Sequence, residues 1–341
     1  MDTKKVLLTG ISGFLGSHTA IQLLEKGYHV KGTLRDLNRA PSIKEVIARH
    51  TRFAHHLSFA EADLSNGHIW SDLMEGMDYV QHIASPFPRE LPRHEDELIL
   101  PAKEGVLHIL KAAASHKIKR VVLTSSGAAV VYGKSKQQLQ QVMDESVWTD
   151  TNYVKDLTPY FKSKTIAESA AWEFIKKNPS EMELVTVLPG AILGPVLEND
   201  YGTSANIVIK LMDGSMPAVP KIGFEIIDVR SVADALIKAM ETPSAACNRY
   251  LLSSGFLMLK DIAQILKKGY PEKKIPTKEL PDFIIKLFST FDASLQPVMI
   301  DLGVKRRVNI NKAKNELNWQ PIASEEAVLS CARSLFEQGI L

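Results

Sequence analysis

The chain has 341 residues, of which 45% are hydrophobic and 23% are charged, so it can bury the core of one large or two modest globular domains. Its 41 Lys and Arg residues and 39 Asp and Glu residues give a net charge of +2, which argues against nucleic acid or a membrane surface as the main partner. Only two cysteines, no run of about 18 apolar residues and no visible signal peptide predict a cytoplasmic protein without a membrane anchor.

Short β-branched runs alternate with longer amphipathic stretches through the first half of the chain. Strands are predicted at KKVLLT, YHVKGTL, LSFAEAD, DYVQHIA, KIKRVVLTSS and ELVTVLP, and helices at 13–26, 97–116 and 159–177. Alternation of this kind predicts an α/β fold of the Rossmann type, a doubly wound parallel sheet with helices on both faces.

The pattern changes after Pro189, where glycine and proline become frequent and the regular alternation is lost. The stretch 224–240 is predicted to form one more strand and helix, and 248–254 another strand, both returning to the main sheet. We therefore predict a main domain of residues 1–189, with 223–255 returning to it. A smaller, discontinuous C-terminal lobe would consist of residues 190–222 and 256–341.

The stretch TGISGFLG places Gly10, Gly13 and Gly16 at the junction of the first predicted strand and the first helix. A tight turn, a close backbone approach to a pyrophosphate and tight helix packing each favour a residue without a Cβ. Amide groups at the N-terminus of the helix can hold the anion. A glycine-rich turn without a ligand is the alternative, but the position after the first strand favours dinucleotide binding.

The end of the second predicted strand indicates which dinucleotide would bind, because an acidic residue there binds a ribose hydroxyl and an arginine accommodates a 2′-phosphate. The residue there is Arg35, with Asp36 one position later, which favours NADP over NAD. The alternative is a solvated Arg35 paired with Asp36. Asp63, at the end of the third strand, is placed to meet the adenine end of the cofactor or, equally, to cap the next helix.

A serine pair in TSS (124–126) ends a predicted strand, and TPYFKSK (158–164) opens a predicted helix. Tyr160 and Lys164 are four residues apart and share one helix face, whereas Lys162 points nearly the opposite way. A tyrosine with a pKa of about 10 is a poor acid or base at neutral pH, and lowering it by about three units needs roughly 4 kcal/mol. A neighbouring ammonium and a nicotinamide cation can supply that energy, and a serine hydroxyl would bond the substrate oxygen. A surface helix pair is the alternative.

The chain resembles the extended short-chain dehydrogenases/reductases, and among them the branch of dihydroflavonol reductase, cinnamoyl-CoA reductase and microbial aldehyde and ketone reductases. The resemblance covers essentially the whole chain and rests on the motifs LLTGISGFLGSH, TLRD, HIASPF, VVLTSS, YFKSKTIAE, LPGAILGP, IIDVRSVADA and NINKAKNELNWQP. It implies an NADPH-dependent reductase of a small-molecule aldehyde or ketone. It also implies that the smaller lobe binds the substrate and that the protein is a monomer or a homodimer.

The resemblance implies that Ser126, Tyr160 and Lys164 form the catalytic set, with Ser125 as the less favoured serine. It further implies that Arg35 binds the NADP phosphate and that Ala84 and Pro189 lie along the cofactor. No metal is expected. The predicted cofactor-binding residues are Gly10, Ser12, Gly13, Phe14, Leu15, Gly16, Arg35, Asp63, Leu64, Ala84, Tyr160, Lys164 and Pro189.

Other functions remain open as alternatives. A nucleotide-sugar dehydratase of this fold would place an acid pair after the catalytic hydroxyl, where this chain has Gly127 and Ala128, and an epimerase would retain NAD, which Arg35 disfavours. A non-catalytic NADP-binding regulator commonly lacks the tyrosine. A serine hydrolase is disfavoured because no histidine follows the serine pair and there is no G-x-S-x-G motif.

The substrate itself is not indicated by the sequence. Phe87, Tyr201 and Phe224 are candidates for its pocket, although core packing is the preferred interpretation of each. His18, His82 and His108 are expected to be packing or helix-surface residues.

Overall fold

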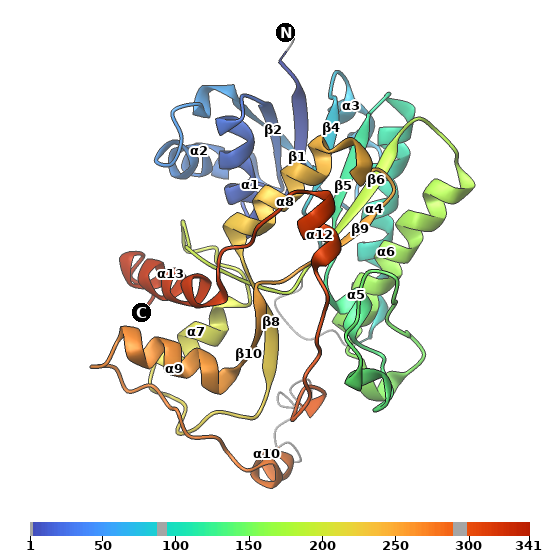
Figure 1. Cartoon of the computed structure of the whole chain (residues 1–341). Helices are drawn as coiled ribbons and strands as arrows, with labels where there is room; N and C mark the ends of the chain where they lie inside the picture. The colour runs from blue at the N-terminus through green and yellow to red at the C-terminus, as the bar shows by residue number, and fades with distance from the viewer. Residues whose placement is uncertain (1–2, 87–93, 289–298) are drawn as a thin grey trace.

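The computed structural model describes residues 3–86, 94–288 and 299–341, and its centre is a seven-stranded parallel sheet (Figure 1). The strand order β3-β2-β1-β4-β5-β6-β9 reverses direction between β1 and β4, as in a doubly wound sheet. The predicted Rossmann-type fold is therefore confirmed. The strands are β1 (Lys5–Thr9), β2 (His29–Leu34), β3 (Leu57–Glu61), β4 (Tyr79–His82), β5 (Arg120–Thr124), β6 (Glu183–Pro189) and β9 (Arg249–Leu252).

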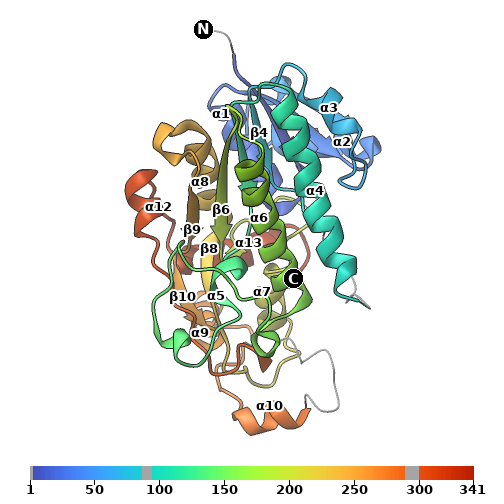
Figure 2. The same ribbon diagram turned by 90° about the vertical axis from the view of Figure 1, so that its right-hand side faces the viewer.

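Helices cover both faces of this sheet because its strands carry apolar residues on both sides. On β1, Val6 and Leu8 pack into one core while Leu7 packs into another. The first core includes α1 (Phe14–Glu25), α2 (Ala40–Ala48) and α8 (Val229–Glu241). The second includes α3 (Ile69–Met74), α4 (Asp96–Ser115) and α6 (Pro159–Lys177), and Figure 2 shows α4 and α6 side by side.

The strand register brings the ends of the central strands to one edge of the sheet. Thr9 pairs with His82, His82 with Leu123, and Leu123 with Thr186. The residues that follow β1, β4, β5 and β6 therefore emerge together, at the edge where parallel sheets bind ligands.

A second, three-stranded sheet of order β10-β8-β7 lies beside this edge. It consists of β7 (Ala191–Leu193), β8 (Gly223–Asp228) and β10 (Gly255–Met258), and a third core joins it to α7 (Ala205–Met212), α9 (Leu259–Gly269) and α13 (Ser324–Glu337). The other α-helices of the described residues are α5 (Ala128–Val131), α10 (Asp282–Phe288) and α12 (Asn311–Glu316).

The position of β8 corrects one prediction. The sequence predicted that both strands between 223 and 255 return to the main sheet. Only β9 does so, by pairing with β6, whereas β8 pairs with β7 and β10. A short apolar run shows that a strand is buried but not which sheet buries it. The predicted domain boundaries stay a prediction.

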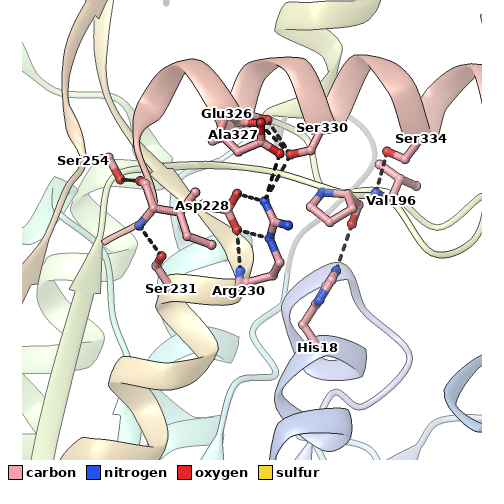
Figure 3. A network of polar contacts seen from close by, with 12 residues as sticks. His18, Val196, Asp228, Arg230, Ser231, Ser254, Glu326, Ala327, Ser330 and Ser334 are labelled. Carbon is pink, nitrogen blue, oxygen red and sulfur yellow. Dashed lines mark hydrogen bonds and ion pairs between the residues drawn. The ribbon is translucent and has the colours of Figure 1, made fainter. Parts of the chain in front are cut away.

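Polar contacts join α1 and α8 to the segment after β7 and to α13 (Figure 3). His18 of α1 donates from Nε2 to the carbonyl of Pro195 at 2.8 Å. Arg230 of α8 pairs with buried Asp228 at 2.7 Å and lies 3.8 Å from Glu326 of α13. These contacts fix the second sheet and its helices against α1 and α8.

Among the described residues, no helix is both long and apolar enough to cross a membrane. In the same part of the chain, no group of three or more His, Cys, Asp or Glu side chains is arranged to hold a metal ion.

Candidate active site

The glycine turn between β1 and α1 forms one wall of a cleft of about 550 Å³, which we call the glycine cleft. The N-cap residue of α1 is Gly13, which has no side chain with which to cap the helix. The first amides of a helix have no partner within the helix, so they are available to an anion. The residues of this turn that line the cleft are Gly10, Ser12, Gly13, Phe14, Leu15 and Gly16.

Close packing of α1 against the turn requires a glycine at position 16. A Cβ built on Gly16 would lie 2.0 Å from the carbonyl oxygen of Gly10, a distance that no side chain can occupy. The same test on Gly13 gives 3.5 Å to the nearest heavy atom, which is ordinary contact. The turn therefore brings α1 close to β1, and the cleft fits the pyrophosphate of a dinucleotide.

The far end of the cleft contains Arg35 and Asp63, as expected for residues that follow β2 and β3. Arg35 is exposed and forms no ion pair within the described part of the chain, whereas the carboxylate of Asp36 accepts a hydrogen bond from the amide of Asn38 at 2.9 Å. The alternative pairing of Arg35 with Asp36 is therefore not observed. Asp63 accepts from the hydroxyl and amide of Ser65, which hold its pKa below the usual value, so it closes a turn and does not cap α3.

Helix α6 presents Tyr160 and Lys164 to the middle of the cleft. The helix begins after Thr158, whose hydroxyl accepts a hydrogen bond from the amide of Phe161 at 3.3 Å. The ammonium of Lys164 lies 5.8 Å from the centre of the Tyr160 ring. Lys162 instead forms an ion pair with Glu95 at 2.7 Å, so the two lysines occupy different faces as the spacing predicted.

The two serines after β5 have different partners. The hydroxyl of Ser125 donates to the buried carboxylate of Glu168 at 2.7 Å and so faces the interior. Ser126 hydrogen-bonds to the hydroxyl of Tyr160 and accepts from the amide of Ala128 at 3.1 Å. The geometry thus separates the two serines, which the sequence could distinguish only by motif position.

The electrostatics of the site differ from the predicted ones. Burial raises the pKa of Tyr160 above its ordinary value of 10.0, and the hydrogen bond with Ser126 opposes this shift. The sequence predicted that the neighbouring ammonium and a bound nicotinamide cation together lower this pKa. Burial has the larger effect here because it disfavours the phenolate, and it also lowers the pKa of Lys164 from 10.5 to about 8, since the buried ammonium is itself disfavoured.

The remaining predicted cofactor residues also line the glycine cleft. Leu64 follows β3, Ala84 follows β4, and Pro189 ends β6, so each lies at the edge where the central strands end. The three histidines that were considered for a serine hydrolase each hydrogen-bond to a residue that is neither Ser125 nor Ser126. The hydrogen-bond partners are the Thr9 hydroxyl for His82, the Pro195 carbonyl for His18 and the Leu64 carbonyl for His108.

A second cavity of about 450 Å³, which we call the apolar cavity, adjoins the glycine cleft. Ser126 and Tyr160 line both hollows, as do Pro189 and Gly190. The apolar cavity also receives residues from β8, β10 and the segment 301–308. The hydroxyls on Ser126 and Tyr160 therefore stand where a compound in the cavity could meet one in the cleft.

Known proteins match the chain over the same elements. The profile of the NAD dependent epimerase/dehydratase family covers residues 6–251, from β1 to β9. The chain belongs to this family. It is 32% identical to a cinnamoyl-CoA reductase (CAD2) of Medicago truncatula, over 92% of this chain and 97% of that protein. It is 31% identical to a bifunctional dihydroflavonol 4-reductase/flavanone 4-reductase of Malus domestica, over 87% of this chain and 82% of that protein.

Among solved structures, yeast methylglyoxal/isovaleraldehyde reductase Gre2 complexed with NADPH matches with a TM-score of 0.82 and 26% identity, covering 99% of this chain and 100% of that one. The predicted resemblance to the dihydroflavonol reductase-like branch of the extended short-chain dehydrogenases/reductases is confirmed. This family member is an NAD(P)-dependent reductase.

The sequence missed most of the apolar cavity of this reductase. Phe224 lines it and also packs against the third core, as does Tyr201, so the preferred interpretation of core packing holds for both residues. Phe87 lies outside the described residues. The lining residues without a signal in the sequence include Tyr132, Phe161, Ile207, Glu225, Phe256, Asp301 and Arg306, which come from segments far apart in the chain.

Proposed function

We propose that the protein is an NADPH-dependent carbonyl reductase that converts an aldehyde or ketone of a small molecule to the corresponding alcohol. The observation that carries this proposal is the placement of Ser126 and Tyr160. Their hydroxyls form a hydrogen bond where the glycine cleft meets the apolar cavity. A carbonyl group bound in the apolar cavity would lie within reach of both hydroxyls, and the cleft would hold the cofactor beside it.

The cofactor half of the proposal is supported by the glycine cleft and by the yeast reductase that was crystallised with NADPH. The uncapped N-terminus of α1 suits a pyrophosphate. Arg35 would bind the 2′-phosphate, for which an exposed guanidinium with no ion pair among the described residues is well suited.

Reduction requires a proton donor at the oxygen of the substrate. Bound NADPH supplies the hydride. In our proposal Tyr160 donates its proton to the carbonyl oxygen, and Ser126 donates a hydrogen bond to the same atom. The ammonium of Lys164 stabilises the negative charge left on Tyr160, which matters because the buried phenolate is costly.

Two substitutions separate the chemical half of the proposal from the cofactor half. Tyr160→Phe should reduce turnover by about a hundredfold or more while leaving NADPH affinity nearly intact, because it removes the hydroxyl that donates the proton and keeps the ring. Arg35→Glu should weaken NADPH binding much more than NADH binding. The measurements are initial rates of NADPH oxidation and fluorescence titrations with both cofactors.

The substrates for these assays come from a screen of aldehydes, α-dicarbonyls, β-keto esters and flavanonols, with a nucleotide-sugar panel beside it. Unchanged turnover in Tyr160→Phe would rule out the acid role. Equal titration curves for the two cofactors before and after Arg35→Glu would remove the phosphate assignment. A response only to nucleotide sugars would replace carbonyl reduction with the epimerase or dehydratase alternative.

A further inference from the structure

Three of the described residues that line the apolar cavity carry a charged side chain: Glu225, Asp301 and Arg306. Every other described side chain of the lining is uncharged. The sign and the pairing of these three charges therefore decide which charged groups a substrate can bring into the cavity.

The N–H groups of the Arg306 guanidinium all donate hydrogen bonds within the protein. Its Nε donates to Asp301 at 2.8 Å, and its terminal nitrogens donate to both carboxylate oxygens of Asp156 and to the carbonyls of Val131 and Ile300. These contacts use all five N–H groups of the side chain. Two carboxylates thus surround one guanidinium, and no donor of Arg306 is left for an anionic substrate.

Glu225 has no such cation beside it. Within the described ranges it forms no ion pair, and both of its oxygens accept hydrogen bonds, Oε2 from the Ser253 hydroxyl at 2.5 Å and Oε1 from the Val308 amide at 3.2 Å. Burial raises the pKa of Glu225 above its ordinary value of 4.5, and the hydrogen bonds from Ser253 and Val308 oppose this shift because they stabilise the carboxylate. The donors fix the side chain while each oxygen keeps a further lone pair for a ligand.

The backbone places Glu225 near the reacting end of the cavity. A Cβ built on Gly190 would lie 2.2 Å from the carbonyl oxygen of Glu225 and 3.1 Å from its Cβ, so β8 passes directly against the residue that follows Pro189. Gly190 lines both the glycine cleft and the apolar cavity. A substrate held beside Tyr160 therefore shares the cavity with the Glu225 carboxylate.

We propose that Glu225 is a specificity-determining residue, which rejects carbonyl compounds that carry a carboxylate or phosphate and accepts a hydrogen bond from those that carry a hydroxyl. This inference rests on the proposed function. An anion in the cavity would be repelled by Glu225 and would find no cation with a free donor among the described lining residues, whereas a neutral hydroxyl gains a charged acceptor. The substrate class is then an uncharged, hydroxylated, largely apolar aldehyde or ketone.

Three benzaldehydes that differ only at the 4-position test this directly: 4-formylbenzoate, its methyl ester and 4-(hydroxymethyl)benzaldehyde. With saturating NADPH, the wild-type kcat/KM should be at least about tenfold lower for the carboxylate than for the ester, mainly through KM. The hydroxymethyl compound should be the best of the three. If the protein reduces carbonyl compounds in the screen but none of these three, their inhibition constants against the best screened substrate are compared in the same way.

The substitution Glu225→Gln assigns the effect to one residue. It should raise the carboxylate-to-ester ratio of kcat/KM at least about tenfold and remove the preference for the hydroxymethyl compound. Glu225→Thr, a shorter β-branched residue suited to a strand, serves the same purpose if the glutamine variant does not fold. Glu279→Gln is the matched control, because it removes one exposed carboxylate that does not line the cavity and should leave both ratios unchanged.

Equal wild-type kcat/KM values for carboxylate and ester would overturn the proposal. So would a discrimination that persists in both Glu225 variants, since another group would then cause it. A protein that oxidises NADPH with no carbonyl compound of any kind would refute the proposed function itself, which is a different result from either of these.

Discussion

Lys162 and Lys164 are two residues apart on α6 and have opposite environments. Lys162 is paired with Glu95 near the surface, whereas Lys164 faces Tyr160 in the glycine cleft. Burial lowers the pKa of Lys164 to about 8, so its ammonium form dominates below that pH and its neutral amine above it. At the scale of one residue, the spacing places Lys164 beside Tyr160 in a buried position. Because of that burial, the charge of Lys164 changes in mildly alkaline solution.

We expect the rate of carbonyl reduction to follow this titration. Because the ammonium is the form that stabilises the Tyr160 phenolate, kcat/KM should fall as the pH rises through about 8. Lys164→Arg keeps the charge and should move the fall to higher pH, since a guanidinium stays protonated. The measurement is kcat/KM for the best screened aldehyde between about pH 6 and pH 10.

Lys162→Arg is the control for this profile and should reproduce the wild-type curve. A wild-type profile that stays flat through pH 8, or one that shifts equally in the two arginine variants, would contradict the role of Lys164.

At the scale of one element, local chemistry determined the bounds of α6 and the packing of α1. Thr158 and Pro159 are a cap and a first-turn residue that the sequence displays openly, and α6 begins and ends where it was predicted. The glycine turn was equally visible. The two glycines differ, however, and only the structure separates a packing requirement at Gly16 from ordinary van der Waals contact at Gly13.

This difference predicts unequal effects of two alanine substitutions. Gly16→Ala should lower the free energy of unfolding by about 1–3 kcal/mol, because its methyl group would push α1 away from the carbonyl of Gly10. Gly13→Ala should cost less than about 1 kcal/mol, the loss expected of a weaker N-cap. Urea unfolding of the cofactor-free variants measures both, and a larger loss for Gly13→Ala would show that the packing argument is wrong.

At the scale of the whole molecule, Arg306 holds the C-terminal segment against the main domain. It contacts Asp156 from the segment after β5 and Asp301 near the C-terminus, and its guanidinium lies 4.1 Å from the centre of the Tyr132 ring. All of these side chains are buried. The ion pairs therefore join segments separated by about half of the chain and form one wall of the apolar cavity.

Removing this guanidinium should be costly because it leaves two buried carboxylates without their partner. Arg306→Met is expected to lower the free energy of unfolding by about 3–5 kcal/mol. Arg307→Met, which changes an exposed neighbour, should stay within about 0.5 kcal/mol of the wild type. Urea unfolding followed by tryptophan fluorescence checks both, and similar midpoints for the two variants would mean that the network contributes little.

The sequence also predicted a cytoplasmic location and a monomeric or homodimeric state. Both stay predictions.

The sequence alone determined the features that depend on neighbouring residues: the alternation of strands and helices, the glycine turn after β1, and the tyrosine and lysine on one face of α6. Hydrophobic period, cap chemistry and helix spacing act over a few residues, so they can be read directly. The tertiary structure alone decided which serine faces the tyrosine, which sheet receives β8, and which charges meet in the apolar cavity. Glu225 and Arg306 line the same cavity although they are 81 positions apart, and no local pattern records that folding brings them to one cavity.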